Sequence, residues 1–193
     1  AKVILEEKAV IAVTKEGENV TKSLCNKSFG IENVPFKKIP LDISTMTGDN
    51  DWVAIIPADG NSLGETIMQI GSDKDLLSKF SKSLGEATVK SAVAAFNTIM
   101  GLNKGKEDDP YPLRPVVLGG DDVTLICRGD LAIPYVAKFL EEFENNTRDC
   151  CGQYLTDAHA YGPGGRDHLT ACAGIAFIKS SYPFYYGYNL AEE

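Results

Sequence analysis

Two adjacent acidic residues, Asp121 and Asp122, follow two glycines, Gly119 and Gly120, in the middle of the chain. Strand-forming apolar residues flank this Gly-Gly-Asp-Asp motif, which is typical of a β-hairpin with the four residues at its tip. Two neighbouring carboxylates repel each other unless a cation or solvent screens them. The motif therefore predicts either a Mg²⁺ or Mn²⁺ site that handles a nucleoside triphosphate or, as is common in proteins, an exposed acidic turn.

A third carboxylate, Asp59, ends an apolar run over residues 52–58 and is followed by Gly60, Asn61, Ser62, Leu63 and Gly64. The apolar run predicts a central strand that is covered on both faces. Where such a strand leads through a glycine into a helix, main-chain N–H groups point outward and favour phosphate. A plain strand–helix corner, capped by Asn61 or Ser62, has the same residue pattern.

The elements that must position these residues follow from the periodicity of the apolar side chains. We expect strands at 51–58, 114–119, 122–128 and 169–178, and helices at 63–70, 74–100 and 131–147 and after Pro183. Asp73 and Asp130 are expected to cap the second and third helices. The order β-α-β-β-α-β predicts an α+β, ferredoxin-like fold.

The ferredoxin-like order places the first and third strands side by side at the centre of the sheet. The end of the first strand and the hairpin tip therefore reach the same edge, which predicts that Asp59 approaches Asp121 and Asp122. Three carboxylates there can hold two Mg²⁺ ions that align a triphosphate with an attacking 3′-hydroxyl. The N–H groups of residues 60–62 would then receive the β- and γ-phosphates.

Composition bounds the remaining possibilities. The chain has 193 residues and a net charge of −8, which argues against strong binding of duplex nucleic acid but not against a nucleotide held through metal. Its five cysteines form no Cys-x-x-Cys pair, so we expect free thiols in a reducing compartment. The sequence has no signal peptide and no apolar stretch of membrane-spanning length, and we expect a cytoplasmic protein without membrane partners.

All of the motifs lie in residues 49–193, which predicts one domain there. Residues 1–48 are interpreted as an N-terminal β extension with short strands at 3–5 and 10–13, a turn at Gly17 and Asn19, and a loop. The chain begins without Met and ends in a helical pattern, so we expect a piece of a longer protein.

Three stretches, 58–64, 118–123 and 173–179, resemble the second palm domain of the Cas10/Cmr2 proteins of type III CRISPR systems. The following Tyr182-Pro183-Phe184 and Leu190-Ala191-Glu192-Glu193 extend the similarity. The resemblance implies a palm domain of the polymerase and nucleotide-cyclase type that binds ATP and a divalent metal, Mg²⁺ or Mn²⁺. Active members of this family make cyclic oligoadenylates, which activate effector nucleases.

By this resemblance, Asp59 and Asp121 would be metal ligands, and Asp122 would complete a catalytic acidic group. Residues 60–64, Gly119, Gly120 and Lys179 would contact the nucleotide, with Lys179 on a phosphate. A second palm domain or CRISPR-type effector subunits would be the protein partners.

Two departures keep alternatives open. Asn61 stands where many relatives carry a second Asp, which weakens a two-metal site and favours a non-catalytic nucleotide-binding or scaffold palm. The Gly-Gly-Asp box also resembles diguanylate cyclases that use GTP, although the usual Glu-Phe ending is replaced here by Asp122 and Val123.

Overall fold

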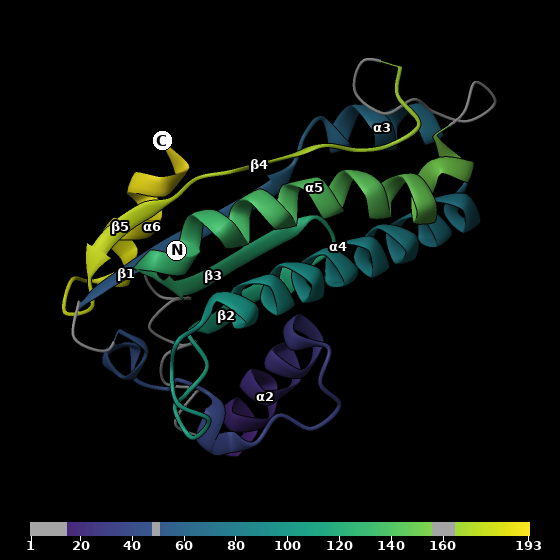
Figure 1. Ribbon diagram of the computed structural model, residues 1–193. Coiled ribbons are helices and arrows are strands. Elements are labelled where there is room, and N and C mark those ends of the chain that lie inside the picture. Colours follow the sequence, from purple (N-terminus) through teal and green to yellow (C-terminus); the bar gives the residue numbers. More distant parts are fainter. Residues whose placement is uncertain (1–14, 48–50, 156–164) are drawn as a thin grey trace.

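A five-stranded antiparallel sheet organises the chain in the computed structural model, which describes residues 15–47, 51–155 and 165–193 (Figure 1). The strands are β1 (Trp52–Gly60), β2 (Leu113–Gly119), β3 (Asp122–Arg128), β4 (Ala171–Ala173) and β5 (Ala176–Lys179). Their order is β2-β3-β1-β4, and β5 also pairs with β1. The first and third strands are neighbours, which confirms the predicted α+β, ferredoxin-like arrangement.

Helices lie on both faces of this sheet and next to one of its edges. They are α2 (Lys15–Phe29), α3 (Leu63–Ile70), α4 (Lys74–Leu102), α5 (Ala132–Cys151) and α6 (Phe184–Glu192). Short 3₁₀ segments are η1 (Phe36–Lys38), η2 (Ile43–Met46), η4 (Gly129–Leu131) and η5 (Gly152–Tyr154). Among the described helices, none combines the length and the apolar character needed to cross a membrane.

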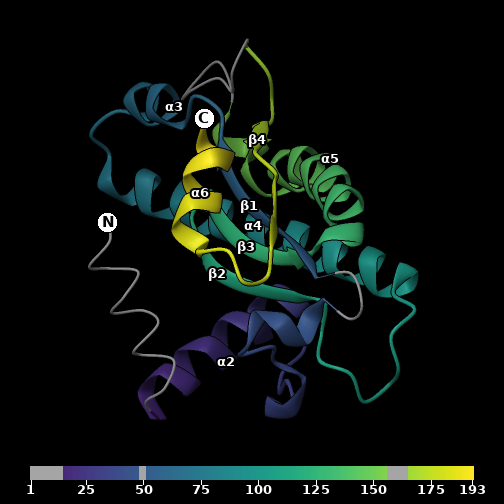
Figure 2. The ribbon, with the colours of Figure 1, turned by 90° about the vertical axis from the view of Figure 1, so that its left-hand side faces the viewer.

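The central strand β1 is buried on both faces because its side chains alternate between two cores. Ala54 and Ile56 belong to the larger core, together with side chains of α4 and α5. Val53 and Ile55 belong to a smaller core, against which α6 packs. The pair α4 and α5 therefore lies on one face of the sheet and α6 on the other (Figure 2). Asp59, at an odd-numbered position, lies on the α6 face.

The strand expected at 169–178 is divided into β4 and β5 by Gly174 and Ile175. The register is the same on both sides of the break, since Ala58 pairs with Ala173 and Ile55 with Ala176. The break lies opposite Pro57, which has no N–H to donate to a neighbouring strand.

The helix after Asp73 begins as predicted, because its carboxylate accepts hydrogen bonds from the N–H groups of Asp75 and Leu76, at 3.0 and 3.1 Å. The expected capping by Asp130 is wrong. Its two carboxylate oxygens bind the Arg128 guanidinium at 2.6 and 3.1 Å instead, and the two-point ion pair is stronger than a capping bond. The helix α5 starts after η4, at Ala132, and continues to Cys151.

The turn expected at Gly17 and Asn19 is also wrong, because α2 runs through both positions. Tertiary packing stabilises this helix: the Phe29 ring stacks on Phe96 of α4 with centroids 4.2 Å apart and meets Tyr111 edge-on. The strands expected at 3–5 and 10–13 lie outside the described residues. A domain boundary near residue 48 stays a prediction.

Candidate metal and nucleotide site

The register between β1 and β3 brings two of the predicted carboxylates together. Ala58 pairs with Val123, so Asp59 and Asp122, the next residue pair in this register, are cross-strand neighbours where β1 ends and β3 begins. Side chains alternate along each strand, and Ile126, like Asp122 at an even-numbered position, lies in the core under α6. Asp59 and Asp122 therefore project from the same face of the sheet.

The tip of the β2–β3 hairpin carries the third carboxylate. Gly119 pairs with Asp122, which leaves Gly120 and Asp121 as a two-residue turn. Gly120 has a φ of +64°, whereas Asp121 has a negative φ. A positive φ at only the first central residue is the pattern of a type II′ hairpin turn, where glycine is strongly preferred.

Asp59, Asp121 and Asp122 together form what we call the acidic cluster. One carboxylate oxygen of each residue lies within 4.8 Å of one from each of the others. Burial raises the pKa of Asp121 to about 6, and the hydrogen bond with Asp59 and the neighbouring negative charges add to the rise. Burial and the charge of Asp59 also raise the pKa of Asp122. The group thus has the ligand chemistry and the unrelieved repulsion that suit a divalent cation.

The chain leaves β1 beside this cluster and enters α3 through Ser62. This residue has a φ of +56°, a left-handed conformation that is strained for a side chain other than glycine, and its hydroxyl makes no capping bond. The first helical bond runs from the N–H of Thr66 to the Ser62 carbonyl. The N–H groups of Leu63 and Gly64 therefore have no acceptor within the helix and suit an anion.

Asn61 forms two hydrogen bonds with Thr170, which immediately precedes β4. Its N–H donates to the Thr170 carbonyl at 2.8 Å, and its side-chain amide donates to the Thr170 hydroxyl at 2.9 Å. The predicted phosphate contact through the Asn61 N–H is therefore wrong, because that donor is already used. Its amide joins two parts of the chain 109 residues apart.

The glycines around the acidic cluster differ in how much space they leave. A Cβ added at Gly64, Gly119 or Gly120 would meet nothing within 4 Å. A Cβ added at Gly60 would lie 3.0 Å from the Cβ of Asp121 and 3.1 Å from its Oδ2. The approach over the hairpin and the start of α3 is thus open, while Gly60 lets the two strand ends come close.

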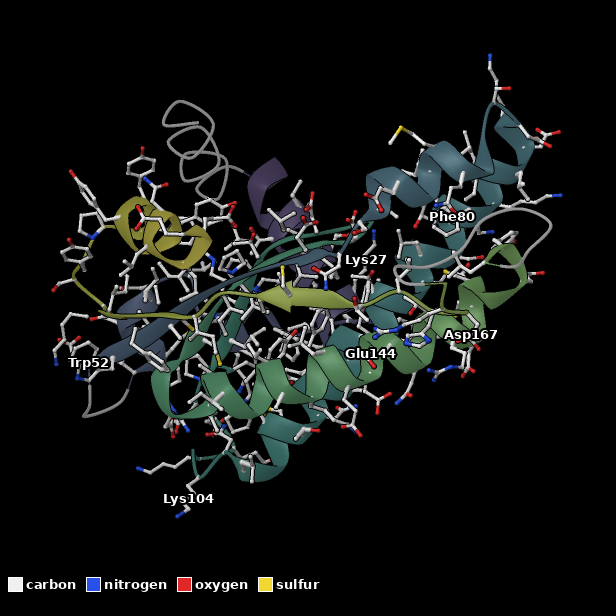
Figure 3. All side chains as sticks on the ribbon, turned by 90° about the horizontal axis from the view of Figure 1, so that it is seen from above. Lys27, Trp52, Phe80, Lys104, Glu144 and Asp167 are labelled. Carbon is white, nitrogen blue, oxygen red and sulfur yellow. The ribbon has the colours of Figure 1, made fainter. Side chains whose placement is uncertain are left out.

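The structure does not bring Lys179 to this site. Lys179 pairs with Trp52, seven residues before Asp59 on β1, a separation of roughly 23 Å at about 3.3 Å per residue. Its ammonium group lies 4.4 Å from the centre of the Trp52 ring. Figure 3 shows Trp52 toward one end of the molecule and Asp167, in the segment that leads to β4, toward the other end. The predicted phosphate contact of Lys179 is therefore wrong.

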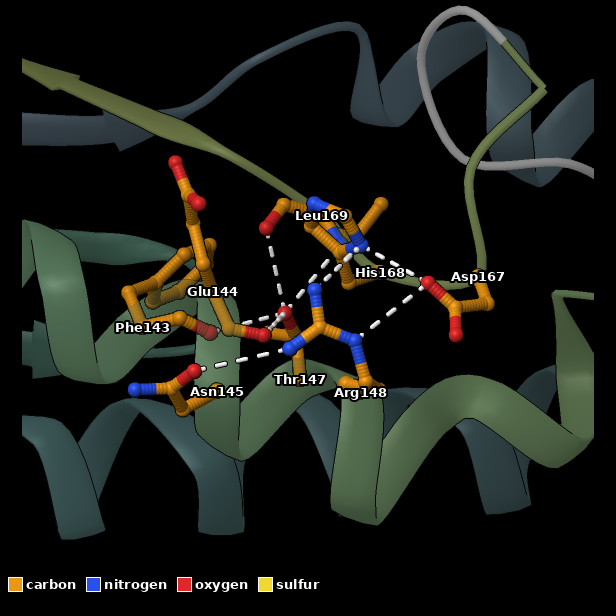
Figure 4. Close-up of polar contacts among 8 residues, drawn as sticks. All are labelled: Phe143, Glu144, Asn145, Thr147, Arg148, Asp167, His168 and Leu169. Atoms are coloured by element: carbon orange, nitrogen blue, oxygen red, sulfur yellow. Dashed lines mark hydrogen bonds and ion pairs between the residues drawn. The ribbon is translucent and has the colours of Figure 1, made fainter.

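A polar network on α5 fixes the segment that leads into β4 (Figure 4). The buried Thr147 hydroxyl accepts a hydrogen bond from the Leu169 N–H at 3.1 Å. Arg148 forms an ion pair with Asp167 at 3.4 Å and lies 3.0 Å from His168, which itself contacts Asp167. Together with the bonds of Asn61, these contacts hold β4 against β1. His168 lies in the irregular segment before β4.

Comparison with known families agrees with this geometry. The model of the family described as Cas10/Cmr2, second palm domain, matches residues 52–193. The chain belongs to this family. Solved structures of a Csm1–Csm4 cassette in complex with cA4 and with pppApA share the palm fold, with TM-scores of 0.53 and 0.51 at 16% sequence identity. The similar region covers 78% and 73% of this chain but only 20% and 18% of those chains. Curated protein sequences include no significant match.

One wall of the site in this palm domain was not predicted. Gly187 fits α6 onto Ile55 and Ile178, and Gly174 fits under the carbonyl of Ala191, so the last turn of α6 lies near the end of β1. Burial raises the pKa of Tyr188, and the charges of Glu192, Asp122 and Asp59 raise it further. Tyr188 packs on the α6 face of the sheet, the face from which Asp59 and Asp122 project. The sequence signal is the four-residue spacing of Tyr188 and Glu192, which places them on one helical face.

The palm domain also carries a thiol beside the acidic cluster. Cys172 on β4 is the register partner of Asp59, and register partners project from the same face of a sheet. Its side chain is exposed, whereas those of Cys25, Cys127 and Cys151 are buried. Cys172 therefore offers a chemical handle next to the site.

Proposed function

We propose that the acidic cluster binds a divalent cation, Mg²⁺ or Mn²⁺, and that the palm domain binds the triphosphate of ATP beside it. The observation that carries this proposal is the approach of the carboxylate oxygens of Asp59, Asp121 and Asp122 to within 4.8 Å of one another. Carboxylate oxygens are the ligands these ions prefer. The raised pKa of Asp121 supports the proposal, because a cation between the carboxylates would relieve their repulsion.

The groups of the chain itself would orient the nucleotide. The N–H groups of Leu63 and Gly64 would receive phosphate oxygens, and the strained backbone at Ser62 sets their direction. The open space over Gly119 and Gly120 would admit the phosphates to the hairpin tip. When bound, the cation would neutralise phosphate charge and polarise the bond to be broken.

We further propose that this domain takes part in forming phosphodiester bonds from ATP, giving cyclic oligoadenylate in a CRISPR-type antiviral system of the cytoplasm. Membership of the family supports this, and related cassettes have been solved with pppApA and cA4. In this role the acidic cluster would be catalytic. Joining two nucleotides requires that a second one be presented to the first, so we expect a second palm domain or another effector subunit as partner.

One observation favours a second candidate, a palm that binds nucleotide without turnover. Asn61 brings no charge to the site, and its amide is engaged by Thr170. Because Asn61 replaces the second Asp of many relatives, the site has three carboxylates where those relatives have four, and therefore less negative charge to hold two divalent cations. Under this alternative, ATP binding with metal would help to organise an assembly.

Titration calorimetry and mass analysis of products separate these functions. The 193-residue protein is incubated with Mn²⁺ and either ATP or GTP. We expect metal-dependent binding of ATP that is lost when Asp121 and Asp122 are both replaced by Ala. The matched control replaces another adjacent acidic pair, Asp108 and Asp109, which is exposed in the loop before β2.

Each result has one meaning. Oligoadenylate supports the nucleotidyltransferase, ATP binding without product supports the non-catalytic palm, and a product made only from GTP supports the diguanylate-cyclase-like alternative. Binding that is equally strong in the Asp121 and Asp122 double variant would refute the metal site.

A further inference from the structure

A buried threonine on the long helix α4 contacts the tip of the acidic hairpin. Thr88 is 1% exposed. Its hydroxyl oxygen lies 2.6 Å from the carbonyl oxygen of Gly120 and 3.0 Å from that of Leu84, one helical turn earlier. A hydroxyl has one proton to donate, and the shorter distance assigns it mainly to Gly120.

The Gly120 carbonyl belongs to the peptide unit that joins Gly120 to Asp121. Because a peptide unit is planar and trans, a carbonyl directed toward α4 makes the N–H of Asp121 point away from α4. Turning this peptide over would change φ at Asp121 and, with it, the direction in which the Asp121 side chain leaves the backbone. The orientation of one peptide plane therefore determines where both the N–H and the carboxylate of Asp121 lie.

This peptide plane has an alternative orientation. The observed turn has positive φ at Gly120 only, as in type II′. In a type I′ turn, which joins strands equally well, the central peptide is turned over and the second residue also has positive φ. Aspartate is among the residues that tolerate this conformation. Local sequence thus permits both turns, and a contact from outside the hairpin can select one of them.

We propose that Thr88 is a positioning residue of the metal site, whose hydroxyl holds the Gly120–Asp121 peptide in the orientation that directs the Asp121 carboxylate toward Asp59 and Asp122. This inference rests on the proposed function, because it takes the acidic cluster as a cation site. Hydrogen-bond partners behind metal ligands commonly change metal affinity by about 10- to 100-fold when they are removed.

The same helix offers a matched control. The Thr98 hydroxyl donates to the Ala94 carbonyl at 3.0 Å, the same distance that separates the Thr88 hydroxyl from the Leu84 carbonyl, and no further hydrogen bond of the Thr98 hydroxyl is found among the described residues. A Thr98→Val variant therefore removes an equivalent helix bond without touching the hairpin. Thr88→Val removes the hydroxyl at nearly constant volume, and Thr88→Ser keeps it.

Mn²⁺ affinity, measured by electron paramagnetic resonance on the folded protein without nucleotide, is the test, with circular dichroism to record folding. We expect Thr88→Val to bind Mn²⁺ about 10-fold more weakly. Thr88→Ser should stay within about 3-fold of the original protein, and Thr98→Val should bind equally well. If Thr88→Val does not fold, Thr88→Ala takes its place with the same expected loss.

The outcomes distinguish this inference from the proposed function. Unchanged affinity in Thr88→Val, or in Thr88→Ala where that variant is used, overturns the inference, and so does a loss in Thr88→Ser as large as in Thr88→Val. If the original protein binds no Mn²⁺, or if Asp121→Asn binds Mn²⁺ with the same affinity as the original protein, the assignment of the metal site itself is wrong.

Discussion

Replacing Asp121 with Asn should stabilise the metal-free protein at neutral pH. The pKa of Asp121 is raised from 3.8 to about 6 in the folded chain, so its ionised form is less favourable there than in the unfolded chain. Below the unfolded pKa both states hold the proton and nothing is lost. As the pH rises through the folded pKa, the folded state loses stability relative to the unfolded state, and the loss is complete at neutral pH.

The size of the effect follows from the shift. A rise of about two pKa units corresponds to roughly 3 kcal/mol as an upper bound. Because Asp121 is only half-buried, solvent screening reduces this to on the order of 1 kcal/mol. For a chain of this size, Asp121→Asn should therefore raise the melting temperature by about 2 to 4 °C.

Thermal unfolding followed by circular dichroism, with a chelator present, measures this difference. We expect it at about pH 7.5 and expect it to shrink as the pH is lowered and to be absent below about pH 3, where Asp121 is largely protonated in both states. Glu107→Gln is the control, since it makes the same change of charge at an exposed loop position far from the hairpin. Its melting temperature should change by less than about 1 °C.

With the cation bound, the original protein should become more stable than Asp121→Asn. Mn²⁺ at about 100 times its dissociation constant adds roughly 2.7 kcal/mol to the original protein, and Asp121→Asn should gain much less because it lacks one charged ligand. A lower melting temperature of Asp121→Asn than of the original protein in chelator at neutral pH would refute the destabilising effect of the Asp121 charge. Equal stabilisation of both proteins by Mn²⁺ would refute its role as a metal ligand.

Three further predictions concern the surroundings of the cluster. Gly60→Ala places a Cβ 3.0 Å from that of Asp121 and should weaken Mn²⁺ binding about 10-fold. Gly64→Ala adds a Cβ in open space and should leave Mn²⁺ binding unchanged. Equal Mn²⁺ affinities of the two variants in calorimetry would contradict the effect expected at Gly60. Ser62→Gly removes left-handed strain and should raise the melting temperature by about 2 to 4 °C, and a lower value would show that the backbone at Ser62 is not strained. A bulky maleimide on Cys172 should block binding of Mn²⁺ and ATP, and Mn²⁺ with ATP should slow the labelling. Cys172→Ser is its control, and full binding by the labelled protein would place the nucleotide elsewhere.

The sequence was sufficient where structure depends on neighbouring residues. The Gly-Gly-Asp-Asp hairpin, the cap at Asp73 and the apolar run before Asp59 are each recognisable within a few positions, because turns, caps and strands have local residue preferences. Their order also led to the ferredoxin-like arrangement and, through it, to the approach of Asp59 to the hairpin.

Contacts between distant parts of the chain were not predictable in this way. The helix α2 was missed, although Thr21, Cys25 and Phe29 are buried on one helical face, because it is stabilised by aromatic residues of α4 and of the loop before β2. The expected cap at Asp130 failed for a local reason, because Arg128, only two residues earlier, binds the Asp130 carboxylate instead.

The site itself shows the same division. Residue types, together with the order of the expected strands and helices, predicted that carboxylates and glycines gather at one sheet edge. Only the tertiary structure decided that Asn61 is bound by Thr170, that Lys179 lies at the far end of β1, and that a helix hydroxyl reaches the hairpin tip. The physical reason is that these outcomes depend on strand register and helix placement, which are set by the packing of the whole core and change by several ångströms for a shift of one residue.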